Sequence, residues 1–188
     1  HLVPTVIEKN KQREYAYDIY SRLLEDGSFL LTGTIDDKMS SSIVGQLLYL
    51  ESLDNNADIL CILIPGGSIN AGMAIYDTMN FIKCDVSTIV IGMAASIGCL
   101  LLSAGAKGKV VVYLIVEIMI HQPLGAFEGQ GSDIEISAKR IIKTKGKIKF
   151  KFLVKIQIAI DKIVIDTDRD HFLEPDEALE YGLIDEVI

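Results

Sequence analysis

A serine among small residues is the first place where this chain could do chemistry. Ser96 lies in the stretch Gly92–Gly98, after a short apolar run that predicts a strand and before a run typical of a helix. At such a junction a serine hydroxyl gains exposure, and the helix dipole supports developing negative charge. The spacing is not that of a G-x-S-x-G motif, so tight helix packing explains the stretch better when it is taken alone.

His121 is the residue best suited to take a proton from Ser96. It ends the apolar run Ile118–Ile120, so we expect it to lie where a strand leaves its sheet. A neutral imidazole at that position can accept the serine proton, although a buried structural histidine explains the same residue equally well. His1 is terminal and His171 lies in a charged segment, which makes both weaker candidates for a base.

An orienting carboxylate and an anion-binding turn complete the set. Asp166, Asp168 and Asp170 could each hold the histidine in one tautomer, and spacing does not choose among them or exclude a solvated charge cluster. Gly66 and Gly67 follow a strand-like run, where backbone N–H groups can face a cleft and stabilise an anion, although an ordinary turn would look the same. Together these residues supply a nucleophile, a base, an acid and an oxyanion hole.

Composition excludes several classes of function. The 188 residues fit one domain, and 18 Lys and Arg against 26 Asp and Glu give a net charge of −8, which argues against nucleic-acid binding. No apolar run reaches the ~20 residues of a spanning helix, and we expect no signal peptide. The odd cysteine count without a C-x-x-C spacing (Cys61, Cys84 and Cys99) argues against a zinc site or disulfides and fits a reducing compartment.

Strand-like and helix-like segments alternate along the chain, which indicates βαβ units and an α/β fold. Short apolar or β-branched runs predict strands at Ile59–Ile64, Ser87–Gly92 and Val110–Ile120. Helical spacing predicts helices at Asp37–Asp54, Ala71–Ile82, Ala94–Ala104, Asp133–Lys145 and Pro175–Tyr181.

Several motifs in collinear order resemble the proteolytic subunit of bacterial Clp proteases. They cover nearly the whole chain: Tyr17–Leu24, Pro65–Gly67, Ala71–Met79, Gly92–Ser96, Gly105–Lys109, Met119–Gly125, Asp133–Ile136, Asp168–Asp170 and Tyr181–Asp185. The resemblance implies a crotonase-like α/β fold of repeated βαβ units with a protruding handle. It also implies a single domain over residues 1–188, with an axial loop at about 1–17 and the handle at about 122–147.

The resemblance implies roles for individual residues. Ser96 would be the nucleophile, His121 the general base and Asp170 the orienting carboxylate of a serine endopeptidase. The backbone N–H groups of Gly67 and Ile97 would form the oxyanion hole. An extended peptide would lie between two segments, contacting Gly66, Ser68, Ile69, Pro123, Leu124 and Gly125.

The resemblance also implies an assembly. Two stacked heptameric rings of this chain would enclose the active sites, and an ATP-driven AAA+ unfoldase would feed in unfolded polypeptides. ATP would act on that partner, so this subunit would need no cofactor and no metal, and the chain has no G-x-x-x-x-G-K-[ST] loop. We expect a bacterial cytoplasmic protein without nucleic-acid or membrane partners.

Three segments differ from the family pattern. Ile62–Ile64 stands where the family has an Asn-Ser or Asn-Thr pair and is one residue shorter, which would change side-chain facing near the oxyanion hole and at the unfoldase-docking surface around Leu60. Val110–Glu117 replaces a turn with a β-branched run. Lys147–Ile165 alternates polar and apolar residues like a strand, but our prediction follows the family and expects helix.

Two other functions fit parts of the pattern. A crotonase-fold acyl-CoA enzyme also uses a backbone oxyanion hole beside a Gly-Gly turn, but it normally lacks the serine, histidine and aspartate set. A non-catalytic ring scaffold would share the whole fold, although such paralogues lose triad residues that are all present here.

Overall fold

A parallel five-stranded sheet forms the centre of the molecule. The computed structural model describes residues 2–9, 13–63, 66–155 and 160–188. Every neighbouring pair in the sheet is parallel, in the order β10-β7-β5-β4-β3. The strands are β3 (Ser28–Leu31), β4 (Ile59–Leu63), β5 (Val86–Val90), β7 (Val110–Val112) and β10 (Glu186–Val187).

Helices connect these strands, as parallel pairing requires. Helices α2 (Asp37–Leu53), α3 (Ile69–Phe81) and α4 (Ile97–Ser103) lie between successive strands from β3 to β7. Helices α5 (Gly131–Lys155), α6 (Ile160–Asp166) and α7 (Pro175–Tyr181) lie between β7 and β10, whereas α1 (Ile19–Glu25) precedes β3. Between sheet and helices, Leu31, Leu47, Ile75 and Leu101 are fully buried. The predicted α/β class is therefore confirmed, with helices α2, α3 and α7 within a few residues of their predicted bounds.

A second, smaller sheet carries the residues that matter for chemistry. It consists of β6 (Met93–Ala95), β8 (Glu117–Ile120) and β9 (His171–Leu173), with β6 parallel and β9 antiparallel to β8. Its inner face is buried at Ala94 and Ile118.

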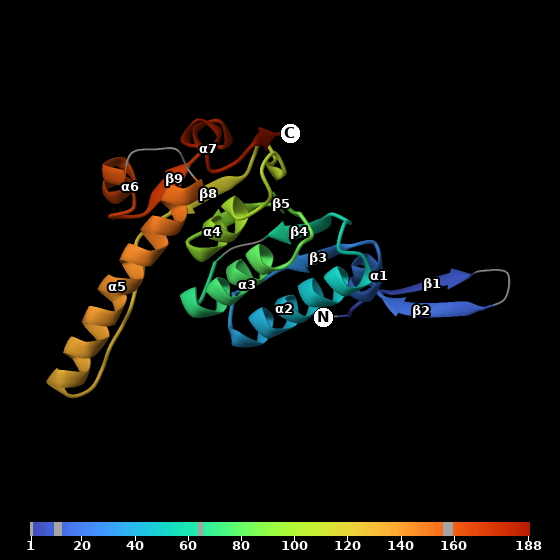
Figure 1. Cartoon of the computed structure of the whole chain (residues 1–188), viewed down its shortest axis with the longest axis horizontal. Coiled ribbons are helices and arrows are strands. Elements are labelled where there is room, and N and C mark those ends of the chain that lie inside the picture. The colour runs from blue at the N-terminus through green and yellow to red at the C-terminus, as the bar shows by residue number, and fades with distance from the viewer. Residues whose placement is uncertain (1, 10–12, 64–65, 156–159) are drawn as a thin grey trace.

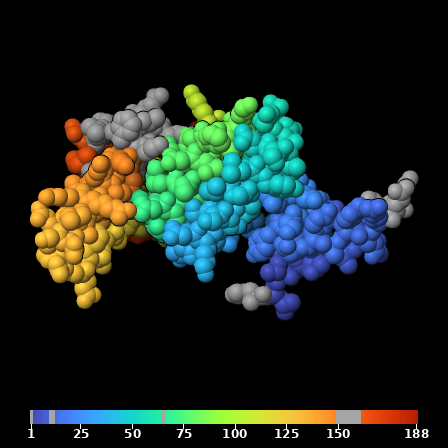
Figure 2. All heavy atoms as spheres, turned by 60° about the horizontal axis from the view of Figure 1, so that its bottom comes forward, coloured from blue at the N-terminus to red at the C-terminus, as the bar shows by residue number. Residues whose placement is uncertain are grey.

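Two elements project from opposite ends of this body (Figure 1). At one end β1 (Thr5–Lys9) and β2 (Glu14–Asp18) form an antiparallel hairpin. At the other end α5 extends outward as a long arm, and Figure 2 shows the same separation in the space-filling view. Among the described residues, none of the helices has the length and apolar character needed to cross a membrane.

Two sequence predictions were wrong in this part of the chain. The single strand expected over Val110–Ile120 is interrupted, because β7 belongs to the large sheet and β8 to the small one. The turn between them is closed by Val116, whose N–H donates to the Tyr113 carbonyl at 3.3 Å, and Ile115 at its tip is 94% exposed. The helix expected from Ala94 starts only at Ile97, because β6 first pairs with β8.

The alternating segment Lys147–Ile165 is helical where the structure describes it, as the family resemblance implied. Helix α5 continues to Lys155 and α6 begins at Ile160, whereas residues 156–159 lie outside the described residues. In the shortened segment, β4 keeps alternate facing, with Cys61 and Leu63 buried and Leu60 exposed. Residues 64–65, where the family pattern changes, also lie outside the described residues.

Candidate active site

The small sheet brings the predicted serine, histidine and aspartate to one edge. Strand β6 ends at Ala95 and the parallel strand β8 ends at Ile120, so Ser96 and His121 each follow a strand end at the same edge. The antiparallel strand β9 begins there, which places Asp170 directly before it. Three residues far apart in sequence therefore lie at the same edge of the sheet, because each is directly adjacent to the end of a strand there.

Ser96 occupies a sharp strand-to-helix turn. Its backbone has φ 57° and ψ −122°, and among the described residues it is the one non-glycine residue with positive φ. Such strain costs about 1–3 kcal/mol and persists only where the surroundings enforce it. The Ser96 N–H donates to the Met119 carbonyl at 2.9 Å, which holds the turn. Although Ser96 precedes α4 at the N-cap, its hydroxyl makes no capping bond, so the oxygen is left for other contacts.

His121 is paired with Asp170. The Nδ1 atom of His121 lies 3.0 Å from Oδ1 of Asp170, and the His121 side chain is 11% exposed. A carboxylate at Nδ1 favours the tautomer with hydrogen on that nitrogen, which leaves the Nε2 lone pair free to accept a proton. Among the interactions of the described residues, no hydrogen bond joins the Ser96 hydroxyl to His121.

The structure distinguishes the three aspartates that spacing left open. Asp166 accepts a hydrogen bond from the Tyr181 hydroxyl at 2.9 Å and lies 3.2 Å from the Lys162 ammonium. Asp168 lies 3.8 Å from the Lys145 ammonium. Asp170 is the one of the three whose carboxylate contacts His121.

Gly66 lies against Ala95 and Ser96, Gly67 lies against Ile35, and neither glycine has room for a side chain. A Cβ on Gly66 would lie 2.2 Å from the Ala95 carbonyl oxygen, and one on Gly67 would lie 2.4 Å from that of Ile35. The Ile35 N–H donates to Gly66 and the Ser68 N–H donates to Ile35, which forms a parallel bridge. In such a bridge the N–H of the middle residue, Gly67, points away from the partner strand.

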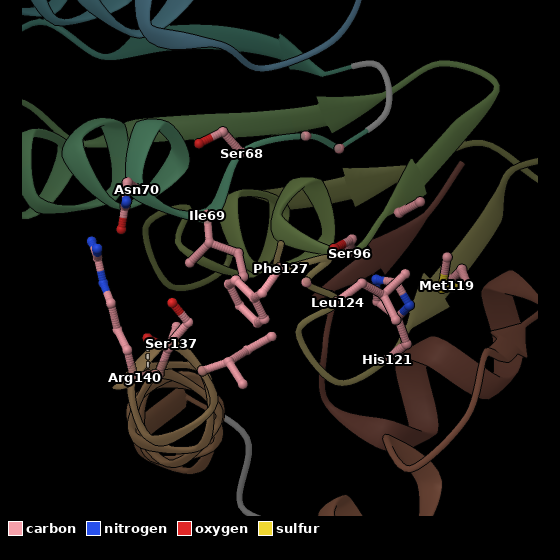
Figure 3. A pocket seen from close by; sticks show the side chains of 16 residues that line it. Ser68, Ile69, Asn70, Ser96, Met119, His121, Leu124, Phe127, Ser137 and Arg140 are labelled. Atoms are coloured by element: carbon pink, nitrogen blue, oxygen red, sulfur yellow. Dashed lines mark hydrogen bonds between the residues drawn. The ribbon is translucent and has the colours of Figure 1, made fainter. Parts of the chain in front are cut away.

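The sequence-predicted residues gather around one cavity of about 630 Å³ (Figure 3). Ser96 and His121 line it together with Gly66, Gly67, Ser68, Ile69, Leu124 and Gly125. The other two, Ile97 and Pro123, line an adjoining side pocket with Ser96, His121, Leu100 and Ile148. Asp170 lies behind His121, so the structure brings all of the predicted site residues together.

Sequence reasoning missed one wall of the cavity. Helix α5 contributes Ser137, Arg140, Ile141 and Thr144 to the lining, and Asn70 and Phe127 join them from other segments. The four α5 residues recur at intervals of three, one and three, so they form one face of the helix. That spacing could have indicated a shared face, but nothing local indicates that the face turns back toward Ser96.

Burial and hydrogen bonding shift the pKa values of Cys99 and Asp166, which lie near the site. Burial raises the pKa of the Cys99 thiol, three residues after Ser96, to about 12. Burial also opposes ionisation of Asp166, but the hydrogen bonds from Tyr181 and Lys162 together keep its pKa below the usual range. Asp166 is therefore held as a carboxylate that anchors the segment preceding Asp170.

With this geometry established, comparison with known families is informative. The family model described as Clp protease matches residues 11–188, nearly the whole chain. The chain belongs to the Clp protease family. Membership implies the crotonase-like α/β fold, and the parallel sheet with its second small sheet is consistent with that fold. It supports a peptidase function over the acyl-CoA chemistry that the Gly-Gly turn alone also allowed.

Proposed function

We propose that the chain is a serine endopeptidase that cleaves unfolded polypeptides, with Ser96 as nucleophile, His121 as general base and Asp170 as orienting acid. The observation that carries this proposal is the convergence of the three residues at one edge of the small sheet, with His121 and Asp170 paired at 3.0 Å. Family membership supports the peptidase class.

In the first half of the reaction, the Ser96 hydroxyl attacks the carbonyl carbon of the scissile bond. His121 Nε2 takes the hydroxyl proton, and the Asp170 carboxylate stabilises the imidazolium that forms. The carbonyl oxygen becomes an oxyanion that the N–H groups of Gly67 and Ile97 hold. As the tetrahedral intermediate collapses, the C–N bond breaks, and His121 gives its proton to the leaving amine.

In the second half, water hydrolyses the acyl-enzyme. His121 takes a proton from water while the hydroxide attacks the ester carbonyl, and the second tetrahedral intermediate collapses to release a carboxylic acid. Ser96 regains its proton from His121. The cycle requires the Ser96 hydroxyl to come within hydrogen-bond reach of Nε2, a contact that often tightens only when substrate binds.

The cavity shape supports an extended peptide as the substrate. The segment Gly66–Ile69 and the segment Pro123–Gly125 line the same space from two elements. An extended chain between them could pair its backbone with both segments, as in an added β-strand. Gly66, Ser68, Ile69, Pro123, Leu124 and Gly125 are the proposed contacts.

The proposed working unit is a pair of stacked heptameric rings served by an AAA+ unfoldase in the bacterial cytoplasm. Clp protease family members generally form oligomeric proteolytic complexes with unfoldases. Large exposed apolar side chains support contacts with neighbouring subunits, among them Phe81 at 77%, Ile115 at 94% and Ile142 at 67% exposure. The α5 arm with the preceding segment would join the rings as the handle, and the β1–β2 hairpin would form the axial loop. The subunit would need no cofactor of its own, because ATP acts on the unfoldase.

A fluorophosphonate probe tests the nucleophile, because it forms a covalent adduct with an activated serine. We expect one adduct per chain at Ser96, identified by peptide mass spectrometry and lost in Ser96→Ala. Ser137→Ala, which removes another hydroxyl from the same cavity, is the matched control and should keep the label. Labelling that survives Ser96→Ala would place the nucleophile elsewhere, and an assembled ring without any labelling would favour the scaffold function.

A further inference from the structure

The wall of the cavity formed by α5 carries a charge that catalysis does not use. Most of the lining is apolar, from Ile69, Met119, Leu124, Phe127 and Ile141. Arg140 is the one lining residue in the described structure with a permanent charge, and the lining includes no aspartate or glutamate.

Arg140 has no acidic partner among the described residues. Its neighbour Lys139 pairs with Glu135 at 2.6 Å across one helical turn, so the local acid is already engaged with a different cation. In Figure 3 the Arg140 side chain extends from α5 toward Asn70, in the first turn of α3. Thus the guanidinium stands beside the start of a 13-residue helix, where the helix dipole is also positive. This end of the cavity is electropositive.

The position of Arg140 separates it from the cleaved bond. The side pocket that adjoins Ser96 and His121 is lined by Ile69, Ile97, Leu100, Pro123 and Ile148, and the described residues that line it include no Lys, Arg, Asp or Glu. In Figure 3, Arg140 and Asn70 lie across the cavity from Ser96 and His121, and an extended chain advances about 3.3 Å per residue. Arg140 would therefore meet a substrate residue two or three positions from the cleaved bond, while the residue at the bond enters apolar surroundings.

We infer that Arg140 makes this end of the cavity a carboxylate subsite, which selects peptides carrying an aspartate or glutamate side chain two or three residues from the cleaved bond. The inference rests on the proposed peptidase function and adds a substrate class to it. A guanidinium recognises a carboxylate through paired N–H···O bonds. Arg140 itself is exposed, so the expected preference is modest.

Matched fluorogenic peptides measure the preference directly. Each peptide is short, internally quenched and capped at both ends, and each pair differs only by Glu against Gln at one position on either side of the bond. For the wild-type assembly we expect kcat/KM to favour Glu about three- to fivefold at one position two or three residues from the bond, at low salt. The ratio should fall toward one in 0.5 M salt, because salt screens exposed charges.

Two substitutions test the assignment to Arg140. Arg140→Gln should remove the Glu preference, and Arg140→Glu should reverse it, so that Lys at the same position is cleaved faster than Glu. A reversal cannot arise from misfolding. Lys143→Gln, which removes an exposed charge of α5 that does not line the cavity, is the matched control and should leave the ratios unchanged.

The outcomes separate this inference from the proposed function. If the wild-type assembly cleaves none of the peptides and takes up no fluorophosphonate, the peptidase function itself fails. If it cleaves them without a Glu preference, or if Arg140→Gln keeps the preference, the carboxylate subsite is overturned while the peptidase function stands.

Discussion

The two sides of the cavity differ in how closely their atoms are packed. On the sheet side, Gly66 and Gly67 touch backbone so closely that an added Cβ would lie 2.2–2.4 Å from a carbonyl oxygen. On the α5 side, Arg140 is exposed, and Ser137 and Thr144 are only half-buried. The proposed catalytic groups all stand on the first side. In the proposed peptidase, bond cleavage would therefore depend on the closely packed side, whereas peptide selection would rest on the more exposed one.

The largest effect should come from adding a methyl group at one of the two close glycine contacts on the sheet side. In Gly67→Ala the new methyl group meets the Ile35 backbone, so the loop must shift and move the proposed oxyanion donor. Loss of one such donor costs ~10²–10³ in rate, and we expect kcat/KM for a capped peptide to fall by about that factor. Gly131→Ala, at a glycine with open space around it, is the control. Activity of Gly67→Ala within threefold of wild type would contradict the proposed role of this side.

Removing the charge of Asp166, which anchors the segment before Asp170, should have the next largest effect, in this case on stability. Asp166→Asn weakens the bonds from Tyr181 and Lys162, and we expect the free energy of unfolding to fall by about 1–2 kcal/mol at pH 7. Because the folded-state pKa of Asp166 is lowered, its stabilisation is present above the unfolded pKa of ~3.9 and is lost as pH falls through the folded value.

Urea unfolding at pH 7, 5 and 3.5 checks both parts of this prediction. The difference between wild type and Asp166→Asn should be constant from pH 7 to 5 and should shrink at pH 3.5. A difference that grows in acid would show that the sign assigned to Asp166 is wrong. Asp161→Asn, at an exposed position of the same helix, is the control.

Relief of the strained turn should have a smaller effect, and in the stabilising direction. Ser96→Gly and Ser96→Ala both remove the hydroxyl, but only glycine adopts φ 57° without strain. We expect the glycine variant to be more stable than the alanine variant by about 1 kcal/mol, after the entropic cost of glycine is subtracted. For a chain of this size that corresponds to a thermal midpoint higher by ~2–4 °C. An alanine variant at least as stable would mean that the turn is not strained.

The smallest effect should come from breaking the hydrogen bonds by which Lys145 on α5 holds the segment after His121. The Lys145 ammonium on α5 donates to the Gln122 amide oxygen, and Gln122 donates to the Asp168 carbonyl at 2.6 Å. Lys145 is thus a positioning residue for the segment after His121, and Lys145→Ala should lower kcat about two- to fivefold with little change in KM. Lys143→Ala is the control on the same helix. An equal loss in both variants, or a change in KM alone, would assign Lys145 a different role.

The sequence was most informative where a residue's role depends on its immediate neighbours. Ser96 and His121 each follow a short apolar run, and the structure places both just beyond strand ends. The choice of Asp170 rested on family resemblance, because Tyr181 and Lys162 engage Asp166, and Lys145 lies near Asp168, only in the folded chain. Lys162 lies one helical turn before Asp166, but Tyr181 and Lys145 come from other segments, so local spacing does not reveal that both Asp166 and Asp168 have partners.

Other features could not be predicted because the fold overrides local preference. The β-branched run from Val110 to Ile120 favours a strand, yet the chain must turn at Tyr113–Val116 to pass from one sheet to the other. Strand preference depends on what packs against a residue, and Ile115 packs against nothing within the described chain. Arg140 was missed for a related reason, since its helix approaches Ser96 only through the tertiary fold.

The burial of Cys99 has a consequence for how the protein withstands oxidants. Peroxides attack the thiolate form of cysteine, and burial raises the pKa of this thiol to about 12, so almost none of it ionises near pH 7. The Cys99 side chain, on helix α4, is also fully buried and has no contact with solvent. We therefore expect peroxide to leave the Cys99 thiol, three residues after Ser96, in its reduced form.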